Sequence, residues 1–126
     1  MKVLIADDSP IVRERLVDLL SDIGGVELVG QAEDGLQAFE LMIKHRPDVA
    51  IIDVRMPRRT GIDLLRYVNN NPEAPKFIVL TNYPTPENRE RCFDLGAEFF
   101  FDKSSEIEKV IDVLKDLQQG YRTLRH

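Results

Sequence analysis

The chain has 126 residues, enough for one domain with a single core, and its 43% apolar and 31% charged residues are ordinary for a folded protein. No apolar run approaches the ~18 residues of a membrane span, and the first residues reach Asp7 and Asp8 too soon for a signal peptide. We therefore expect a cytoplasmic protein without a membrane partner. The formal charge of -5 argues against direct binding of nucleic acid by this chain.

Short continuous apolar runs, typical of strands buried on both faces, alternate with apolar residues at helical spacing. In chain order, this pattern predicts strands at residues 3–6, 27–32, 49–52, 77–80 and 99–101, and helices at about 10–23, 34–46, 62–68, 87–95 and 107–120.

Start and stop signals support several of these boundaries. Ser9 is a typical N-cap before Pro10 in the first turn, and Asp34 begins the second helix. Gly120 marks the expected end of the last helix. The helix at 87–95 is the weakest of the set because it has few apolar positions.

This alternation predicts an α/β fold with a parallel sheet covered by helices on both faces. No linker or repeat interrupts the pattern, which favours one domain. Two strand orders are common in doubly wound sheets, and periodicity alone does not choose between them.

Functional groups in such sheets gather outside the carboxyl ends of the strands. The polar residues that follow the predicted strands are Asp7 and Asp8, Asp53, Thr81 and Lys103. Three neighbouring carboxylates repel one another unless a cation lies among them, and oxygen ligands of this kind suit Mg2+. The sequence therefore predicts a magnesium site at this edge of the sheet.

The same residues fit the transfer of a phosphoryl group. An aspartate such as Asp53 can accept phosphate as an acyl phosphate when a cation neutralises the incoming group. Lys103 would pair first with Asp53 and then with a phosphoryl oxygen, and Thr81 would donate a hydrogen bond to another. We therefore predict that Asp53 is a phosphoacceptor.

With these positions in place, the chain resembles the receiver domains of two-component response regulators over about its whole length. The residues that carry the resemblance are Asp7-Asp8, Asp53-Val54-Arg55-Met56-Pro57, Gly61, Thr81 and Lys103. The resemblance implies a flavodoxin-like, three-layer α/β/α fold with a five-stranded sheet of order 2-1-3-4-5. The receiver would occupy residues 1–120, and 121–126 would be a short tail or the start of a linker.

The resemblance also implies a role for each residue of the metal site. Asp53 would take its phosphoryl group from a sensor histidine kinase or a histidine phosphotransfer protein. Asp8 and Asp53 would bind Mg2+ directly, Asp7 would bind it through water, and the Arg55 backbone carbonyl would be a further ligand.

A switch is implied as well. Thr81 and Phe100 would respond to phosphorylation and change the surface formed by the fourth helix, fifth strand and fifth helix, where a second copy of the chain is a candidate partner. Phe100 lacks the hydroxyl of the tyrosine common in the family, and Ser104 follows Lys103 where proline is frequent.

The Lys-Ser ending is similar to that of regulators with a helix-turn-helix output domain. We see no output domain in these residues, so we expect either a stand-alone receiver or a receiver cut from a longer regulator.

Three other functions fit less well. A phosphohydrolase with an aspartyl nucleophile needs an acid two residues later, where this chain has Arg55. A flavin-binding domain needs a phosphate-binding loop after the first strand, and Asp7-Asp8 would repel phosphate. An unphosphorylated scaffold has no need of the full acidic set. We therefore expect a signalling phosphoacceptor that catalyses only its own phosphorylation and dephosphorylation, rather than an enzyme.

Overall fold

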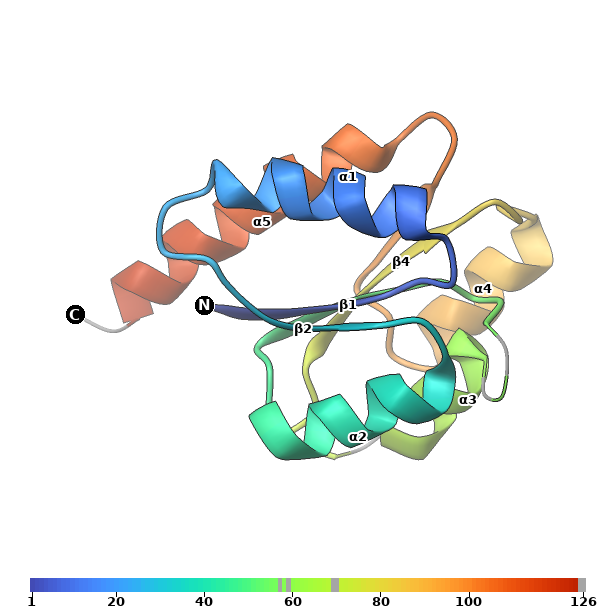
Figure 1. Cartoon of the computed structure of the whole chain (residues 1–126). Helices are drawn as coiled ribbons and strands as arrows, with labels where there is room; N and C mark the ends of the chain where they lie inside the picture. Colours follow the sequence, from blue (N-terminus) through green and yellow to red (C-terminus); the bar gives the residue numbers. More distant parts are fainter. Residues whose placement is uncertain (57, 59, 69–70, 125–126) are drawn as a thin grey trace.

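The computed structural model describes residues 1–56, 58, 60–68 and 71–124 (Figure 1). Its strands are β1 (Lys2–Ala6), β2 (Glu27–Ala32), β3 (Val49–Ile52), β4 (Lys76–Thr81) and β5 (Phe99–Asp102). Its helices are α1 (Pro10–Ser21), α2 (Gly35–His45), α3 (Gly61–Val68), α4 (Pro86–Asp94) and α5 (Ile107–Leu124). Pro57 of the predicted motif and residues 125–126 of the predicted tail lie outside the described residues.

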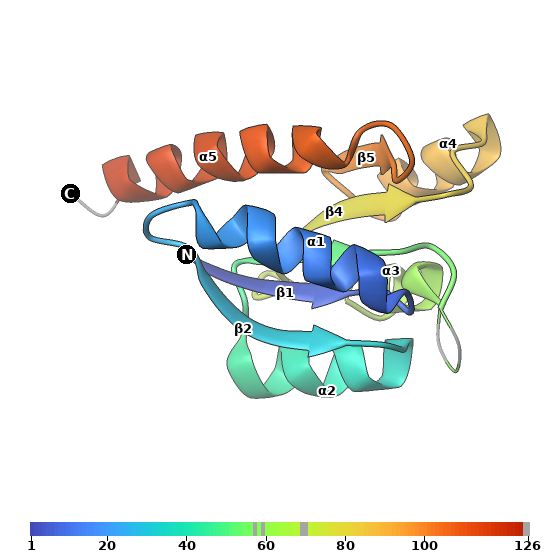
Figure 2. The same ribbon diagram turned by 45° about the horizontal axis from the view of Figure 1, so that its top comes forward.

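The strands form one parallel sheet of order β2-β1-β3-β4-β5, which confirms the expected fold. Helices α1 and α5 cover one face, and α2, α3 and α4 cover the other (Figures 1 and 2). All five strands run in the same direction, so their carboxyl ends meet at one edge. That edge is where the predicted functional residues lie.

Each face of the sheet has its own apolar core because side chains alternate along a strand. Val3 and Ile5 of β1 point toward α1 and α5, where they join Leu16 and Leu114. Leu4 and Ala6 point to the opposite face, toward α2, α3 and α4. Burial on both faces explains why the central strands read as continuous apolar runs.

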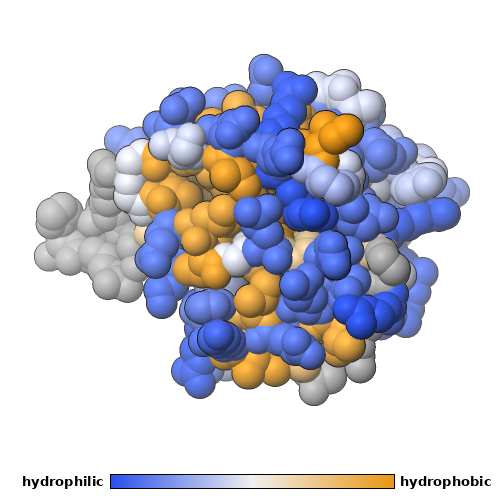
Figure 3. All heavy atoms as spheres, in the orientation of Figure 1, coloured by the Kyte–Doolittle hydropathy of each residue, from blue (hydrophilic) through white to orange (hydrophobic). Residues whose placement is uncertain are grey.

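The edge strand β2 is less covered than the centre of the sheet. Its residues from Leu28 to Gln31 are partly or largely exposed, whereas β3 is buried throughout. The space-filling view shows apolar surface between α1 and β2, and another apolar area over α2 (Figure 3). The sheet is therefore most completely packed at β1, β3 and β4, the strands nearest its middle.

Caps define the helix starts. Ser9 and Asp34 accept hydrogen bonds from the backbone N–H groups three residues later, as expected of N-caps. Thr85 does the same for α4, so this helix begins one residue before the predicted start.

The predicted end of the last helix is wrong. Helix α5 continues through Gly120 to Leu124. One glycine inside a helix costs only about 1 kcal/mol relative to alanine, and this cost alone does not end a helix. The division of the chain into residues 1–120 and a tail stays a prediction. No helix within the described ranges is long and apolar enough to cross a membrane.

The loop after β3 folds back onto the end of the strand that carries Asp53. The Gly61 N–H donates to the Val54 carbonyl at 3.0 Å. A Cβ at position 61 would lie 2.1 Å from the Asp53 carbonyl oxygen, so the backbone passes too close for any side chain. Gly61 is required here by close approach.

We expect Gly61→Ala to destabilise the protein by about 2 kcal/mol, because the new methyl group must displace the backbone of Asp53. Gly120→Ala is the matched control: a Cβ there meets nothing within 4 Å, so the same change should stabilise α5 by about 0.5–1 kcal/mol. Urea unfolding of both variants measures the difference. Equal midpoints for Gly61→Ala and the unchanged protein would contradict the packing argument.

Candidate functional site

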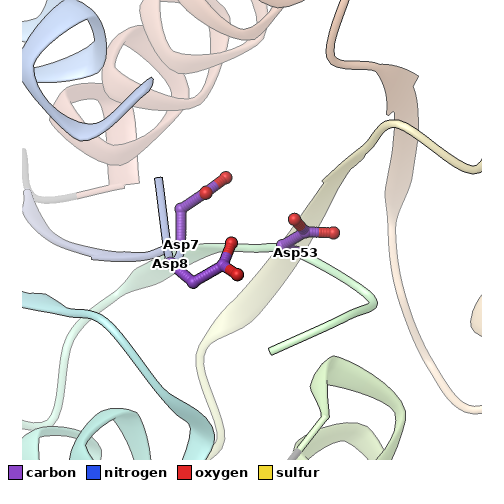
Figure 4. A group of neighbouring side chains, drawn as sticks. All are labelled: Asp7, Asp8 and Asp53. Atoms are coloured by element: carbon purple, nitrogen blue, oxygen red, sulfur yellow. The ribbon is translucent and has the colours of Figure 1, made fainter. Parts of the chain in front are cut away.

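Three carboxylates meet at the carboxyl edge of the sheet. Asp7 and Asp8 follow β1, and Asp53 follows the neighbouring β3 (Figure 4). One oxygen from each of the three lies within 4.8 Å of the others. Asp7 and Asp53 are buried, with 2% and 4% of their surface exposed, whereas Asp8 is open to solvent. The predicted acidic cluster is therefore present.

Lys103 completes the cluster from the end of β5. Its Nζ lies 2.7 Å from Asp7 Oδ2 and 2.5 Å from Asp53 Oδ2, and the side chain is itself buried. The Lys103 backbone N–H donates to the Thr81 carbonyl at 2.8 Å, which fixes the lysine against the adjacent strand. Residues from β1, β3 and β5 are thus joined through one ammonium group.

Burial and charge act against each other in this cluster. Burial raises the pKa of Asp7, an effect that the hydrogen bond from Lys103 only partly offsets. Burial on its own would lower the pKa of Lys103, but hydrogen bonds to Asp53 and Asp7 outweigh it and the pKa is raised. The lysine is therefore held in its charged form.

The loop after β1 is held by contacts that the sequence did not predict. Asp7 Oδ1 accepts a hydrogen bond from the Ser9 N–H at 2.8 Å, and Arg13 Nη1 donates to the Asp7 carbonyl at 2.6 Å. A cation near the N-terminus of a helix opposes the helix dipole. An arginine near the start of a predicted helix therefore indicates that a hydrogen-bond acceptor lies nearby, here the Asp7 carbonyl.

Thr81 is fully buried at the end of β4, between the strands that carry Asp53 and Lys103. Its hydroxyl accepts a hydrogen bond from the Tyr83 N–H at 3.0 Å. The Tyr83 ring in turn lies under the Arg55 guanidinium, with Cζ 4.0 Å from the ring centroid. The Arg55 N–H donates to Asp53 Oδ1 at 3.2 Å, so Arg55 contacts the acidic cluster through its backbone.

Phe100 lies away from the acidic cluster, on the face covered by α4. It is 5% exposed, its ring centroid is 6.4 Å from that of Phe93, and the Arg89 guanidinium lies over both rings. Its neighbours Phe99 and Phe101 point to the other face, where their rings stack with centroids 6.2 Å apart. Phe100 therefore contacts residues of α4.

The loop after β5 forms a turn held by side chains. Asp102 Oδ1 accepts hydrogen bonds from both the N–H and the hydroxyl of Ser104, and the Glu106 carboxylate accepts one from the Asp102 N–H. The Ser104 hydroxyl, followed by its backbone N–H, lowers the pKa of Asp102. These bonds fix the turn beside Lys103, at a place where the family resemblance would have led one to expect proline.

The donor set fits a divalent cation. Asp7, Asp8 and Asp53 against the single ammonium of Lys103 leave a formal charge of -2. All the side-chain ligands are carboxylate oxygens, and the exposed Asp8 leaves one side of the cluster open for water, as Mg2+ prefers. Asp7, Asp8 and Asp53 therefore form a group that could hold a hard divalent cation.

Comparison with known proteins agrees with this geometry. The family model described as the response regulator receiver domain matches residues 3–115. Among curated proteins, the transcriptional regulatory protein PdtaR of Mycobacterium tuberculosis is 39% identical over 123 residues, which are 98% of this chain and 59% of PdtaR. A protein-glutamate methylesterase of Haloarcula marismortui is 38% identical over 92% of this chain but only 32% of its own length. The chain thus spans less than two thirds of these relatives.

Solved structures give the same result. The signal receiver domain of the response regulator NarL from Mycobacterium tuberculosis superposes with a TM-score of 0.85 at 32% identity, covering 94% of this chain and 96% of that one. The isolated REC domain of RcsB from Salmonella enterica serovar Typhimurium, determined with the phosphomimetic BeF3-, has a TM-score of 0.85 at 32% identity, covering 95% and 89%. With this fold, this edge of acidic residues and this family match, the chain belongs to the response regulator receiver domains of two-component systems.

Proposed function

We propose that this chain is a phosphoacceptor that takes a phosphoryl group from a sensor histidine kinase, or a histidine phosphotransfer protein, onto Asp53. The observation that carries the proposal is the position of Asp53, a buried carboxylate held by Lys103 within a cluster of acidic side chains. Such a cluster is destabilising on its own because the carboxylates repel one another. A bound cation would relieve this repulsion and neutralise the charge of an incoming phosphoryl group.

The transfer would form a bond from an Asp53 oxygen to phosphorus as the bond from phosphorus to the donor nitrogen breaks. Lys103 holds Oδ2 at 2.5 Å, and the Arg55 N–H contacts Oδ1 at the longer distance of 3.2 Å, so Oδ1 is the freer nucleophile. Mg2+, when bound by Asp8, Asp53 and the Arg55 carbonyl, with Asp7 acting through water, would neutralise the charge of the incoming group.

The same residues support a switch. Thr81 would turn its hydroxyl from the Tyr83 N–H toward a phosphoryl oxygen, and Lys103 would follow the new negative charge. Helix α4 has one buried residue, Cys92, so we expect it to be the element most easily displaced. Movement of α4 would alter the surroundings of Phe100 and the surface formed by α4, β5 and α5.

The surface formed by α4, β5 and α5 would also be a binding site for partner proteins. Tyr83 and Phe93 are 44% and 38% exposed on or beside α4, where an output domain or a second copy of the chain could dock. We infer a signalling role and not a turnover enzyme, because Arg55 stands where an aspartyl phosphohydrolase needs its acid. The cytoplasmic location and the absence of nucleic-acid binding stay predictions.

Phosphorylation of Asp53 is tested directly with Mg2+ and a small acyl phosphate donor. Intact-mass spectrometry should find one labile phosphate on the unchanged chain, none on Asp53→Ala, and none on either when the cation is chelated. Asp116→Ala removes an exposed carboxylate from α5 and should be labelled normally. Equal labelling of the Asp53 variant, or no labelling of the unchanged chain, would reject the proposal.

Removing a charge from the cluster should stabilise the protein until the cation is added. We expect Asp8→Asn to raise the free energy of unfolding without Mg2+ by about 1 kcal/mol, because it relieves repulsion from Asp7 and Asp53. At a Mg2+ concentration about 100 times the dissociation constant, the unchanged protein should gain about 2.7 kcal/mol and the variant much less.

Urea unfolding with and without Mg2+ measures this reversal of order. Asp18→Asn removes an exposed carboxylate from the last turn of α1, away from the cluster, and should leave the gain from Mg2+ unchanged. A variant at position 8 that gains as much from Mg2+ as the unchanged chain would exclude Asp8 as a ligand.

The stacked pair Arg55 and Tyr83 should slow loss of the phosphoryl group. Both residues flank Asp53, and their contact at 4.0 Å forms a cover that attacking water must pass. A cation–π contact at an exposed site contributes roughly 0.5–1 kcal/mol, so we expect Arg55→Ala or Tyr83→Ala to speed decay of phospho-Asp53 roughly two- to fivefold. Arg91→Ala on α4 is the control, and rates that stay unchanged in all three variants would remove the cover from the mechanism.

A further inference from the structure

The loop that joins β3 to α3 is attached to the acidic cluster at both of its ends. At its start, the Arg55 N–H donates to Asp53 Oδ1, and at its end Gly61 packs against the Asp53 carbonyl. Between these ends, Arg58 reaches across to Asp34 at the start of α2. These three contacts connect the described residues of the loop to Asp53 and to Asp34.

Asp34 makes two kinds of contact at once. Its Oδ1 accepts the Gln37 N–H at 2.8 Å and so caps α2, and its Oδ2 accepts Arg58 Nε at 2.9 Å as well as Arg58 Nη2. The carboxylate side chain is 6% exposed. The Gln37 N–H, followed by Arg58, lowers the pKa of Asp34, which keeps the anion available to both partners.

The backbone conformation of Arg58 is unusual for a residue with a side chain. Its φ is 66°, in the left-handed region that costs a residue with a side chain energy relative to glycine. The conformation aims the guanidinium at Asp34, and two of its nitrogens contact one carboxylate oxygen. Glycine would relieve the strained backbone but would lose the attachment.

We propose that Arg58 and Asp34 are a positioning pair, which holds the β3–α3 loop so that the Arg55 backbone is ready to bind a divalent cation beside Asp53. The inference rests on the proposed function, because Mg2+ binding is part of it. Mg2+ tolerates little departure from octahedral geometry, so a loop fixed in advance binds it more tightly than a loop that must be ordered.

The test compares Arg58 and Arg46, the non-glycine residues that have a positive φ within the described part of the chain. Arg58→Gly removes the pair with Asp34 while relieving the backbone strain, so the protein should stay folded with its melting temperature within about 4 °C of the original. Its affinity for Mg2+, measured by calorimetry on the unphosphorylated chain, should fall about three- to tenfold, below the roughly 10- to 100-fold typical when a direct partner of a metal ligand is removed.

Arg46→Gly is the matched control. Arg46 also has a positive φ, of 46°, and also pairs with an acid, Glu73 at 3.6 Å, but it caps the end of α2 far from the acidic edge. This variant should bind Mg2+ as the unchanged chain does. A loss of affinity in both variants would mean that general loosening, and not the loop, is responsible.

Asp34→Asn provides an independent variant from the other side of the pair. Asparagine keeps the N-cap for Gln37 but loses the charge that holds Arg58, so the affinity of this variant for Mg2+ should fall as in Arg58→Gly. Arg58→Lys keeps a positive charge opposite Asp34 and should retain part of the Mg2+ affinity that Arg58→Gly loses. If the unchanged chain binds no Mg2+, the proposed function itself fails. If the unchanged chain binds Mg2+ and both variants bind it equally well, only the positioning role is overturned.

Discussion

The ammonium of Lys103 between two buried carboxylates is the interaction on which the rest of this structure depends. A buried charge is costly unless it is paired, and here one lysine forms ion pairs with both Asp7 and Asp53. The pairing requires β1 to lie beside β3, as in the order 2-1-3-4-5. In the other common doubly wound order, 3-2-1-4-5, strand β2 would separate the two aspartates. The strand order is therefore what allows Lys103 to contact both aspartates.

Apolar runs located the strands well because a strand buried on both faces leaves no polar positions until it ends. Because Asp7, Asp53 and Lys103 each follow the end of such a run, the sequence also predicts that they lie at one edge of the sheet. Strand order came from the family resemblance, since periodicity does not contain it. Arg13 and the Arg58–Asp34 pair were missed because a single contact between a side chain and a neighbouring loop leaves no periodic pattern in the sequence. The expected stop at Gly120 was wrong because one glycine does not end a helix.

The acidic cluster leaves negative charge unbalanced in the free protein. Lys103 balances one of the three carboxylates, and the remaining formal charge of -2 stays at the rim of the sheet as unrelieved repulsion. Such a site would be stabilised by a cation, which would bind more tightly to arrangements that bring it closer to the carboxylates. Under the proposed function, relief of this repulsion by the cation would favour the bound arrangement.

We expect relief of this repulsion to move the segments at the carboxyl edge of the sheet that are least firmly held by other elements. Asp7 and Asp53 are tied to β5 through Lys103, and the β3–α3 loop is tied to α2 through Arg58. Hydrogen bonds of the β4–α4 loop in the described part of the chain are local, from Tyr83 to Thr81 and from Thr85 and Asn88 to Tyr83. Its contact with another element is the exposed stack with Arg55. If phosphorylation draws Thr81 toward Asp53, we expect this loop and α4 to move most, because the strands and the other loops are bonded to neighbouring elements.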